Sequence, residues 1–249
     1  MKILQGKNAI ITGANRGIGH QIVKTFAKEG CHIWACARKQ SQEFEDDLHE
    51  IAEQNKVHVE PVYFDITDQT QMKSAVSSIQ KGKMQIDILV NCAGIFQVAP
   101  FQMMKSEDFR KIFETDFFGP VELIRNITRL MTHWKKGSII NIASVSGIDP
   151  HPGNTAYGSS KAALIMFTQI LASELAKLGI RVNAIAPGNT DTEMIRPMTN
   201  NVGREAMLDI TAMARFAKPQ EIADAAVFLA SDKSSFITGE VIRVDGGRT

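Results

Sequence analysis

Short apolar runs alternate with helix-length amphipathic segments along the whole chain, and this alternation constrains the fold more than any other feature. The short runs are rich in Ile and Val, as buried strands are, and the longer segments have helical apolar spacing. Strand, helix, strand repeated six times predicts an α/β fold: a parallel sheet wrapped on both faces by right-handed crossovers. We expect strands at NAIIT (8–12), HIWACA (32–37), HVEPVYF (58–64), DILVNC (87–92), GSIINIAS (137–144), RVNAIAP (181–187) and EVIRVDG (240–246), and helices at 18–29, 41–54, 69–80, 107–133, 157–178 and 220–231.

The chain is expected to form one domain over residues 1–249. Its 249 residues are 44% apolar, which suffices for a sizeable core, and no Pro/Ser/Gly-rich linker divides them. The segment 189–216 differs from the rest because it is polar and Met-rich with little periodicity. It is too long for a simple connection, so we predict that it forms a lid over a substrate.

Composition excludes several classes of partner. Lys+Arg number 28 and Asp+Glu 27, a net charge of +1, which argues against a nucleic-acid or anionic-membrane partner. No run approaches the roughly 20 apolar residues of a membrane span, and the N-terminus has no secretory signal. Three cysteines without CxxC spacing indicate reduced thiols rather than a disulfide or metal framework. We therefore expect a cytoplasmic protein with no metal site.

A glycine-rich turn, TGANRGIGHQIV (12–23), follows the first predicted strand and opens the first predicted helix. Gly13, Gly17 and Gly19 would let the backbone turn sharply, approach a pyrophosphate and pack the helix closely on the sheet. The phosphates would then lie on free N–H groups at the helix N-terminus. Glycines alone also make purely structural turns, but the strand–turn–helix context favours a dinucleotide site.

The end of the second predicted strand indicates which dinucleotide binds. NAD sites usually have an acidic residue there to hold the ribose 2′-hydroxyl, whereas this strand ends in Ala37–Arg38–Lys39. Arg16 projects from the glycine turn nearby, and guanidinium groups pair bidentately with phosphate oxygens. Solvated surface arginines are the alternative interpretation. The pattern predicts NADP(H) rather than NAD(H).

The stretch TAYGSSKAAL places Tyr157 four residues before Lys161, on one face of the predicted helix. A free phenol has a pKa of about 10, and a nearby ammonium lowers it by stabilising the phenolate. Such a tyrosine can exchange a proton with an alcohol or carbonyl oxygen. A packed tyrosine beside a snorkelling lysine is the simpler explanation of YxxxK alone.

Other polar segments converge on the same place. Ser144 ends a predicted strand just upstream, where its hydroxyl could bind a substrate oxygen, and Ser146 is the rival hydroxyl. The glycine turn, NCAG and PGNTDT also follow strands, and ligands of open α/β sheets bind at that edge. This convergence favours a catalytic role for the tyrosine.

Taken together, TGANRGIG, NCAG, IAS, YGSSK and APGNTDT resemble the motifs of the classical short-chain dehydrogenase/reductase family over nearly the whole chain. The resemblance implies a single Rossmann-type domain with a seven-stranded parallel sheet, assembled as a homotetramer through helices 107–133 and 157–178. It implies Tyr157 as acid/base, Lys161 as the group that lowers the tyrosine's pKa and holds the ribose, and Ser144 as the group that polarises the carbonyl. The implied NADP(H) contacts are Gly13, Asn15, Arg16, Gly17, Ile18, Gly19, Arg38, Asp65, Ile66, Asn91, Ala93, Gly94, Tyr157, Lys161, Pro187, Gly188, Thr190 and Thr192.

Two positions depart from the family pattern. NNAG is replaced by NCAG, so Cys92 stands at the second asparagine. The family's fourth catalytic residue, an asparagine that helps hold a water beside the lysine, is matched by Asp116 in IFETDFFGP. A carboxylate there would favour the ammonium form of Lys161 and oppose phenolate formation. We expect an active enzyme with an altered proton relay.

The sequence leaves the substrate open between three hypotheses. The block SVSG…YGSSKAAL and the ending ITGEVIRVDGG are most similar to bacterial 3-oxoacyl-[acyl-carrier-protein] reductases, which implies an NADPH-dependent reductase of β-ketoacyl thioesters. Lys135 and Lys136 would then be candidates for carrier docking near the mouth of the site. At the second position expected for docking the sequence has Leu178, with Lys177 adjacent, and surface lysines without any function are the alternative interpretation. A dehydrogenase of a sugar, polyol, steroid or other small alcohol is the second hypothesis. A protein that senses NADP(H) without turnover is the third.

Overall fold

The chain builds one seven-stranded parallel sheet in the order β3-β2-β1-β4-β5-β6-β7, which confirms the predicted Rossmann-type α/β architecture. The computed structural model describes residues 2–196, 205 and 207–247. The strands are β1 (Asn8–Thr12), β2 (His32–Ala37), β3 (Val59–Tyr63), β4 (Ile88–Asn91), β5 (Gly137–Ile142), β6 (Ile180–Pro187) and β7 (Val241–Val244). The main helices are α1 (Gly17–Lys28), α2 (Gln42–Asn55), α3 (Gln69–Lys81), α4 (Ser106–Phe113), α5 (Gly119–Trp134), α6 (Thr155–Leu175) and α8 (Pro219–Ala230).

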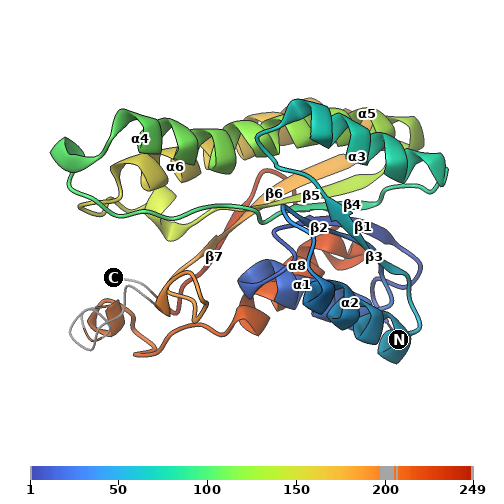
Figure 1. Ribbon diagram of the computed structural model, residues 1–249, viewed down its shortest axis with the longest axis horizontal. Coiled ribbons are helices and arrows are strands. Elements are labelled where there is room, and N and C mark those ends of the chain that lie inside the picture. The colour runs from blue at the N-terminus through green and yellow to red at the C-terminus, as the bar shows by residue number, and fades with distance from the viewer. Residues whose placement is uncertain (1, 197–204, 206, 248–249) are drawn as a thin grey trace.

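Two helical layers cover the sheet. Helices α1, α2 and α8 lie on one face and α3, α4, α5 and α6 on the other (Figure 1). Side chains alternate along each strand, so Ile33 and Ala35 of β2 enter the core under the first layer while Trp34 and Cys36 enter the second. Because strands buried on both faces have no polar side, their sequences read as continuous apolar runs.

The helix predicted over 107–133 is divided in the structure. Helix α4 is followed by a π-helical turn at Glu114–Phe118 and then by α5. Pro120 stands near the start of α5, where its ring would crowd the carbonyl of Asp116 in a regular α-helix. The wider turn accommodates the proline and changes the direction of the side chains on it, including Asp116.

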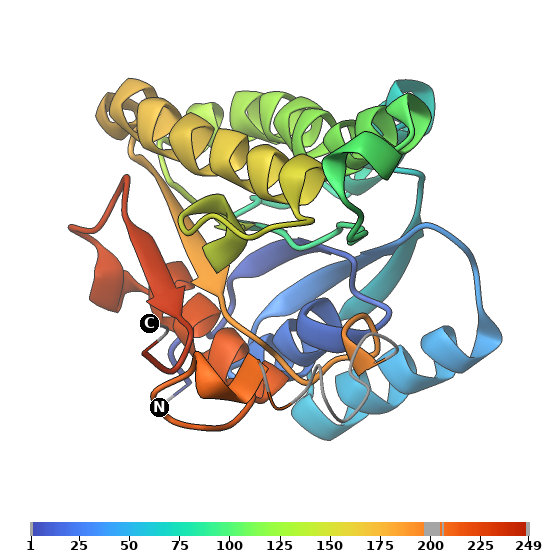
Figure 2. The same cartoon turned by 90° about the vertical axis from the view of Figure 1, so that its left-hand side faces the viewer.

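The carboxyl ends of the parallel strands meet at one edge of the sheet, and the gap between the two helical layers opens there (Figure 2). The glycine turn follows β1, Cys92 follows β4, Ser144 follows β5, and Gly188 follows β6. This edge therefore collects the segments that the sequence singles out.

The predicted lid at 189–216 lies partly outside the described residues, at 197–204 and 206. In its described part, Thr190 pairs with Ala217 as an isolated parallel bridge, and Asn189 Nδ2 donates to the Met207 carbonyl at 3.1 Å. A lid role stays a prediction. Within the described part of the chain, none of the helices combines the length and apolar character that crossing a membrane requires.

Candidate active site

A cleft of about 870 Å³ lies at the carboxyl edge of the sheet. Its wall brings together segments that follow strands β1 to β6. All the predicted site residues except Asn91 line it, namely Gly13, Asn15, Arg16, Gly17, Ile18, Gly19, Arg38, Asp65, Ile66, Ala93, Gly94, Asp116, Ser144, Tyr157, Lys161, Pro187, Gly188, Thr190 and Thr192.

The glycine turn has the geometry that close approach to a phosphate requires. Gly13 and Gly17 have φ of +65° and +56°, in the left-handed region that favours glycine. A Cβ on Gly13 would stand 3.0 Å from the backbone of Ala93, and one on Gly19 would overlap the Gly13 carbonyl. No side chain caps α1, whose first residues line the cleft. The turn therefore fits a dinucleotide pyrophosphate, which would accept hydrogen bonds from the first N–H groups of α1.

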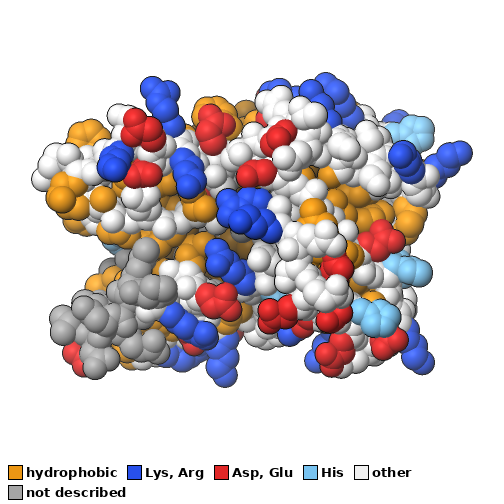
Figure 3. All heavy atoms as spheres, viewed as in Figure 1, with side chains coloured by type: hydrophobic (Ala, Val, Ile, Leu, Met, Phe, Trp, Pro, Cys, Tyr) orange, Lys and Arg blue, Asp and Glu red, His pale blue; other side chains and the backbone are white. Residues whose placement is uncertain are grey.

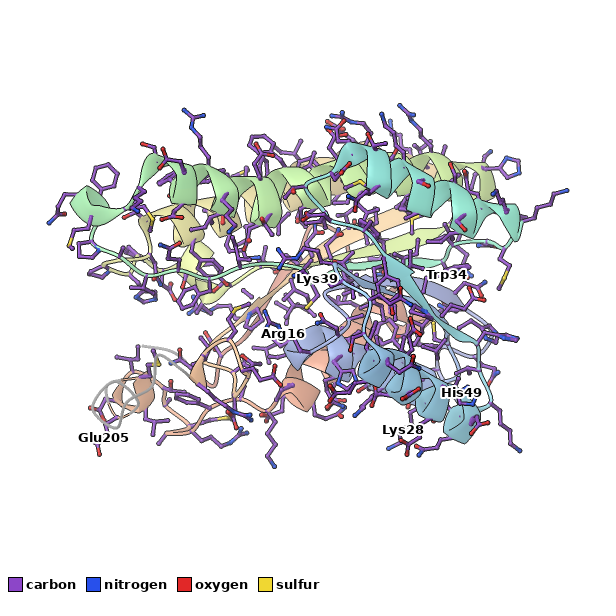
Figure 4. All side chains as sticks on the ribbon, viewed as in Figure 1. Arg16, Lys28, Trp34, Lys39, His49 and Glu205 are labelled. Carbon is purple, nitrogen blue, oxygen red and sulfur yellow. The ribbon has the colours of Figure 1, made fainter. Side chains whose placement is uncertain are left out.

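Three cations border the end of the cleft nearest β2. Arg16, Arg38 and Lys39 are exposed and line it, and Figure 4 places Arg16 and Lys39 at the opening between the helical layers. Figure 3 shows Lys and Arg side chains gathered along this boundary. No carboxylate stands at the end of β2, the position at which an acidic residue in NAD sites would repel a ribose 2′-phosphate.

Asp65 lies on the same part of the wall. Its Oδ1 accepts hydrogen bonds from the Thr67 backbone N–H at 2.9 Å and hydroxyl at 2.7 Å. Partial burial acts to raise the pKa of this carboxyl, but the Thr67 hydrogen bonds and the charge of Arg38 hold it below its ordinary value. An ionised Asp65 is suited to accept a hydrogen bond from an adenine amino group.

Ser144 and Tyr157 face each other across the base of the cleft. Ser144 follows β5, and Tyr157 stands in the first turns of α6. Ser144 is close enough to the Tyr157 phenol to lower its pKa, whereas the hydroxyl of its rival Ser146 accepts from Asn154 Nδ2 at 3.4 Å. The structure therefore favours Ser144 as the hydroxyl that acts with the tyrosine.

The electrostatics at Tyr157 are a balance of opposed effects. Desolvation by the surrounding protein is the largest and raises the pKa of the phenol. The Lys161 ammonium and the Ser144 hydrogen bond lower that pKa, and the charge of Asp116 raises it. The net pKa lies above the ordinary value of a phenol, so the phenol of the free protein is protonated at neutral pH.

Lys161 and Asp116 form an ion pair behind the tyrosine. Both side chains are buried, and Lys161 Nζ lies 3.2 Å from Asp116 Oδ2. The Lys161 ammonium also donates to the Ile142 carbonyl at 3.2 Å and lies 5.6 Å from the centre of the Tyr157 ring. Desolvation acts to lower the pKa of Lys161, but the charges of Asp116 and Tyr157 raise it above its usual value.

Asn91 lies outside the cleft. Its side chain is buried on the face of the sheet that α6 covers, where Nδ2 donates to Asn141 Oδ1 of the neighbouring strand at 2.9 Å. Asn141 Nδ2 in turn donates to Thr168 Oγ1 at 2.8 Å, which links the sheet to α6. The structure gives Asn91 a supporting position beneath the site.

The sequence missed several side chains on the wall. Phe96 lines the cleft, but no motif spacing indicates it. His151, Met194 and Met207 also line the cleft; they lie in GIDPHPGN (147–154) and in the segment 189–216, which the sequence predicts to shape the substrate pocket, although it does not single them out. Cys92 was noted only as a departure from NNAG; burial raises the pKa of its thiol to about 12, so the thiol stays protonated. Loops from different strand ends bring these residues together.

The lysines proposed for carrier docking need a correction. Lys135 and Lys136 are exposed and directly precede β5, and Lys177 precedes β6. They therefore lie at the amino edge of the sheet, opposite the cleft, because parallel strands all run in one direction. Within one chain they do not border the mouth of the site.

Comparison with known proteins agrees with this geometry. A family model described as enoyl-(acyl carrier protein) reductase matches residues 13–249. The chain is 40% identical over 244 residues to the 3-oxoacyl-[acyl-carrier-protein] reductase FabG of Thermotoga maritima, with 98% of each chain covered. The chain belongs to the short-chain dehydrogenase/reductase family.

Solved structures of short-chain dehydrogenase/reductases superpose closely on the chain. One was assigned as a NAD(P)-dependent gluconate 5-dehydrogenase from Beutenbergia cavernae, with bound NADP. It superposes with a TM-score of 0.92 at 31% sequence identity, and the match covers 98% of this chain and 97% of that structure's chain. Another is a 7α-hydroxysteroid dehydrogenase complexed with NADH and a 7-oxo bile acid; it has a TM-score of 0.91 and 32% identity and covers 99% of this chain and 95% of its own. The chain is thus an oxidoreductase of a family that uses NAD(P)H.

Proposed function

We propose that this short-chain dehydrogenase/reductase uses NADPH to reduce a carbonyl to a secondary alcohol, with a 3-oxoacyl thioester as its substrate. The observation that carries the proposal is the placement of Ser144, Tyr157 and Lys161 on one wall of the cleft that also holds the glycine turn. A nicotinamide dinucleotide held by that turn supplies the hydride.

The chain's own groups account for the oxygen side of the reaction. Ser144 donates a hydrogen bond that orients and polarises the carbonyl; one such donor is worth about 3 kcal/mol in other enzymes. Tyr157 transfers its phenolic proton to the oxygen as negative charge develops there. The ammonium of Lys161, 5.6 Å from the ring centre, stabilises the phenolate that remains.

The protonation state of Tyr157 suits a proton donor. Carbonyl reduction begins with a protonated acid, and the raised pKa keeps the phenol protonated at neutral pH. Alcohol oxidation requires the phenolate instead, so we expect the rate of oxidation to increase with pH. The charge of Asp116 opposes ionisation of the phenol and so favours the protonated form.

NADPH is proposed over NADH because three cations border the ribose end of the cleft and β2 ends without a carboxylate. Arg16 and Arg38 would pair with the oxygens of the 2′-phosphate. Asn15 and Ile18 of the turn, Asp65 and Ile66 at the adenine end, and Ala93, Gly94, Pro187, Gly188, Thr190 and Thr192 near the nicotinamide complete the proposed contacts.

Two observations support the thioester substrate. The Thermotoga maritima relative is named for reduction of a 3-oxoacyl group on an acyl carrier protein. Apolar side chains, with Val98, Ile195 and Met207 among them, also line the cleft, and they would suit an acyl chain. A sugar, polyol or steroid alcohol is the second candidate, favoured by the similarity to structures named for gluconate and hydroxysteroid dehydrogenases.

NADPH absorbance, followed with acetoacetyl thioesters and with a panel of keto-sugars and keto-steroids, tests the proposal. Consumption with thioesters supports the first candidate, and consumption with ketones alone supports the second. Cofactor binding without consumption would contradict both and support an NADP(H)-sensing protein.

We also propose that the chain assembles with copies of itself, as a cytoplasmic homotetramer. Helix α6 is apolar on nearly all sides, and Met166 and Ile170 on its outer face are more than half exposed. A helix apolar all round is normally buried. A second copy packed on α5 and α6 would cover this face.

A further inference from the structure

We propose that Phe96 is a positioning residue for Tyr157: its ring holds the phenol in line with the substrate oxygen and closes that side of the site to water. The inference rests on the proposed carbonyl reduction, and it assigns a role to a residue that no sequence motif marks.

The two rings are in direct contact. Their centroids lie 4.7 Å apart and their planes meet at 76°, an edge-to-face arrangement. This geometry is favoured by the quadrupoles of the rings and fixes one ring relative to the other. Lys161 Nζ lies 5.6 Å from the same Tyr157 ring, so the ring is held by an aromatic neighbour and a cation together.

The segment that carries Phe96 is anchored on both sides. Before it, the Ile95 N–H donates to Asp116 Oδ1 at 2.9 Å. After it, the Ala99 N–H donates to the Gly153 carbonyl at 3.0 Å, just before α6 begins. Phe96 thus stands between two hydrogen bonds that hold the backbone on either side of it. The acceptor of the first is the Asp116 carboxylate, which is paired with Lys161.

The local packing leaves little room for this segment to shift. A Cβ on Gly153, which has φ of +84°, would lie 2.8 Å from Val98 Cγ1. The chain therefore passes closely over the loop that precedes α6. Because a catalytic group must stay within a fraction of an ångström of its working position, a rigid neighbour to Tyr157 has a direct kinetic effect.

Phe96 also faces the cleft, since it is half-buried and lines the wall beside Tyr157 and His151. Its ring occupies space that water would otherwise take next to the phenol. Desolvation is the largest effect on the pKa of Tyr157, and it favours the protonated phenol. The ring therefore both orients the proton donor and keeps it in its acid form.

Substitution of Phe96 in the full-length protein tests the proposal. We expect Phe96→Ala to lower kcat for carbonyl reduction about tenfold, because it removes the interaction energy of one aromatic pair. Phe96→Leu should fall between Ala and wild type, and Phe96→Tyr, which keeps the ring, should restore most of kcat. The Kd of NADPH, measured by fluorescence titration, should change less than about twofold.

The pH dependence of kcat distinguishes a positioning role of Phe96 from a general disturbance of the fold. With Phe96→Ala the phenol is better hydrated, its pKa falls, and reduction should decline at lower pH than in wild type. Phe101→Leu, at an exposed ring outside the cleft wall, is the control and should leave kcat and the pH profile unchanged. Equal kcat and superimposable pH profiles for wild type and Phe96→Ala would overturn the proposal.

A readout without substrate keeps this test separate from the proposed function. The chain has two tyrosines, so Tyr63→Phe leaves Tyr157 as the single one. In protein labelled with ¹³C at the tyrosine ring, Phe96→Leu should remove the ring-current shift of Tyr157. If the Tyr157 signal is the same with and without Phe96→Leu, the inference is wrong even if the wild type is active. If that signal changes but the wild type does not reduce any substrate, only the proposed reductase function is wrong.

Discussion

Asp116 Oδ2 lies 3.2 Å from Lys161 Nζ, with both side chains buried directly behind Tyr157. Burial raises the pKa of Asp116 more than the neighbouring Lys161 ammonium and Ile95 N–H lower it. The family resemblance implies an uncharged asparagine at this position, whereas this chain has a titratable carboxyl group. The proposed proton relay therefore contains one more ionisable group.

Asp116→Asn should change the pH dependence of the reaction in a definite direction. The aspartate charge raises the pKa of Tyr157, so its removal lowers that pKa. Reduction requires the protonated phenol, so its rate falls as the pH rises through the pKa of Tyr157. In the variant this fall should therefore begin at lower pH. Oxidation requires the phenolate and should begin at lower pH as well. Glu114→Gln, the same change at an exposed position of the same turn, is the control. Superimposable rate profiles for wild type and Asp116→Asn would remove Asp116 from the relay.

Tyr157→Phe should abolish most of the activity while leaving the fold and the cofactor site intact. Loss of a general acid typically costs roughly 10²- to 10⁴-fold in rate. The measurement is NADPH oxidation with a responsive substrate, beside NADPH binding by fluorescence. Tyr63→Phe is the matched control, since the Tyr63 hydroxyl donates to Glu45 at 2.9 Å away from the cleft wall. If Tyr157→Phe consumed NADPH at the wild-type rate, the assigned acid would be wrong.

Arg38→Ala should weaken the preference for NADPH over NADH. A charge-assisted hydrogen bond to a phosphate is worth enough to change kcat/KM for NADPH by roughly 10- to 100-fold. The kcat/KM for NADH should hardly change, because NADH has no 2′-phosphate. Ala37→Asp adds a carboxylate at the end of β2 and should reverse the preference. Arg129→Ala, at an exposed arginine of α5, serves as the control. An unchanged NADPH/NADH ratio for Arg38→Ala and Ala37→Asp would contradict the assignment of the 2′-phosphate site.

Met166→Glu should reduce the size of the assembly. The side chain is 57% exposed in one chain, and Ile170 lies one turn further along the same face. If a second copy covers this face, a buried unpaired carboxylate there is costly. Light scattering after size exclusion should then show smaller species, whereas Gln54→Glu, at an exposed position of α2 in the other helical layer, should keep the wild-type mass. A wild-type mass for Met166→Glu would remove α6 from the interface.

Thr12→Val should destabilise the fold without changing the volume at the end of β1. Thr12 Oγ1 accepts hydrogen bonds from the N–H groups of Cys92 and Ala93, both at 3.0 Å, and so ties β1 to the turn after β4. Valine leaves both N–H groups without this acceptor, which costs about 1–3 kcal/mol of unfolding free energy. Urea denaturation measures the loss, with Thr70→Val at an exposed site as the comparison.

Much of this architecture was predictable because it depends on local spacing. Strands buried on both faces must be apolar throughout, and the glycine turn needs the residue type whose φ can be positive. Tyr157 and Lys161 share a helix face because four residues make about one turn. The order of strands along the chain then brought Ser144 and the glycine turn to the same edge of the sheet.

The amino-acid sequence by itself determined the sheet, its crossovers and the Tyr157–Lys161 pair, since each follows from periodicity or from residue type. Tertiary structure alone decided that Asp116 meets Lys161, that Phe96 packs on Tyr157, and that Asn91 hydrogen-bonds Asn141 on the face of the sheet covered by α6. These contacts join residues on different elements, so they depend on how the layers pack and on the π-helical turn that directs Asp116 inward. Spacing along the chain does not predict such contacts, because they form only when the two helical layers pack on the sheet.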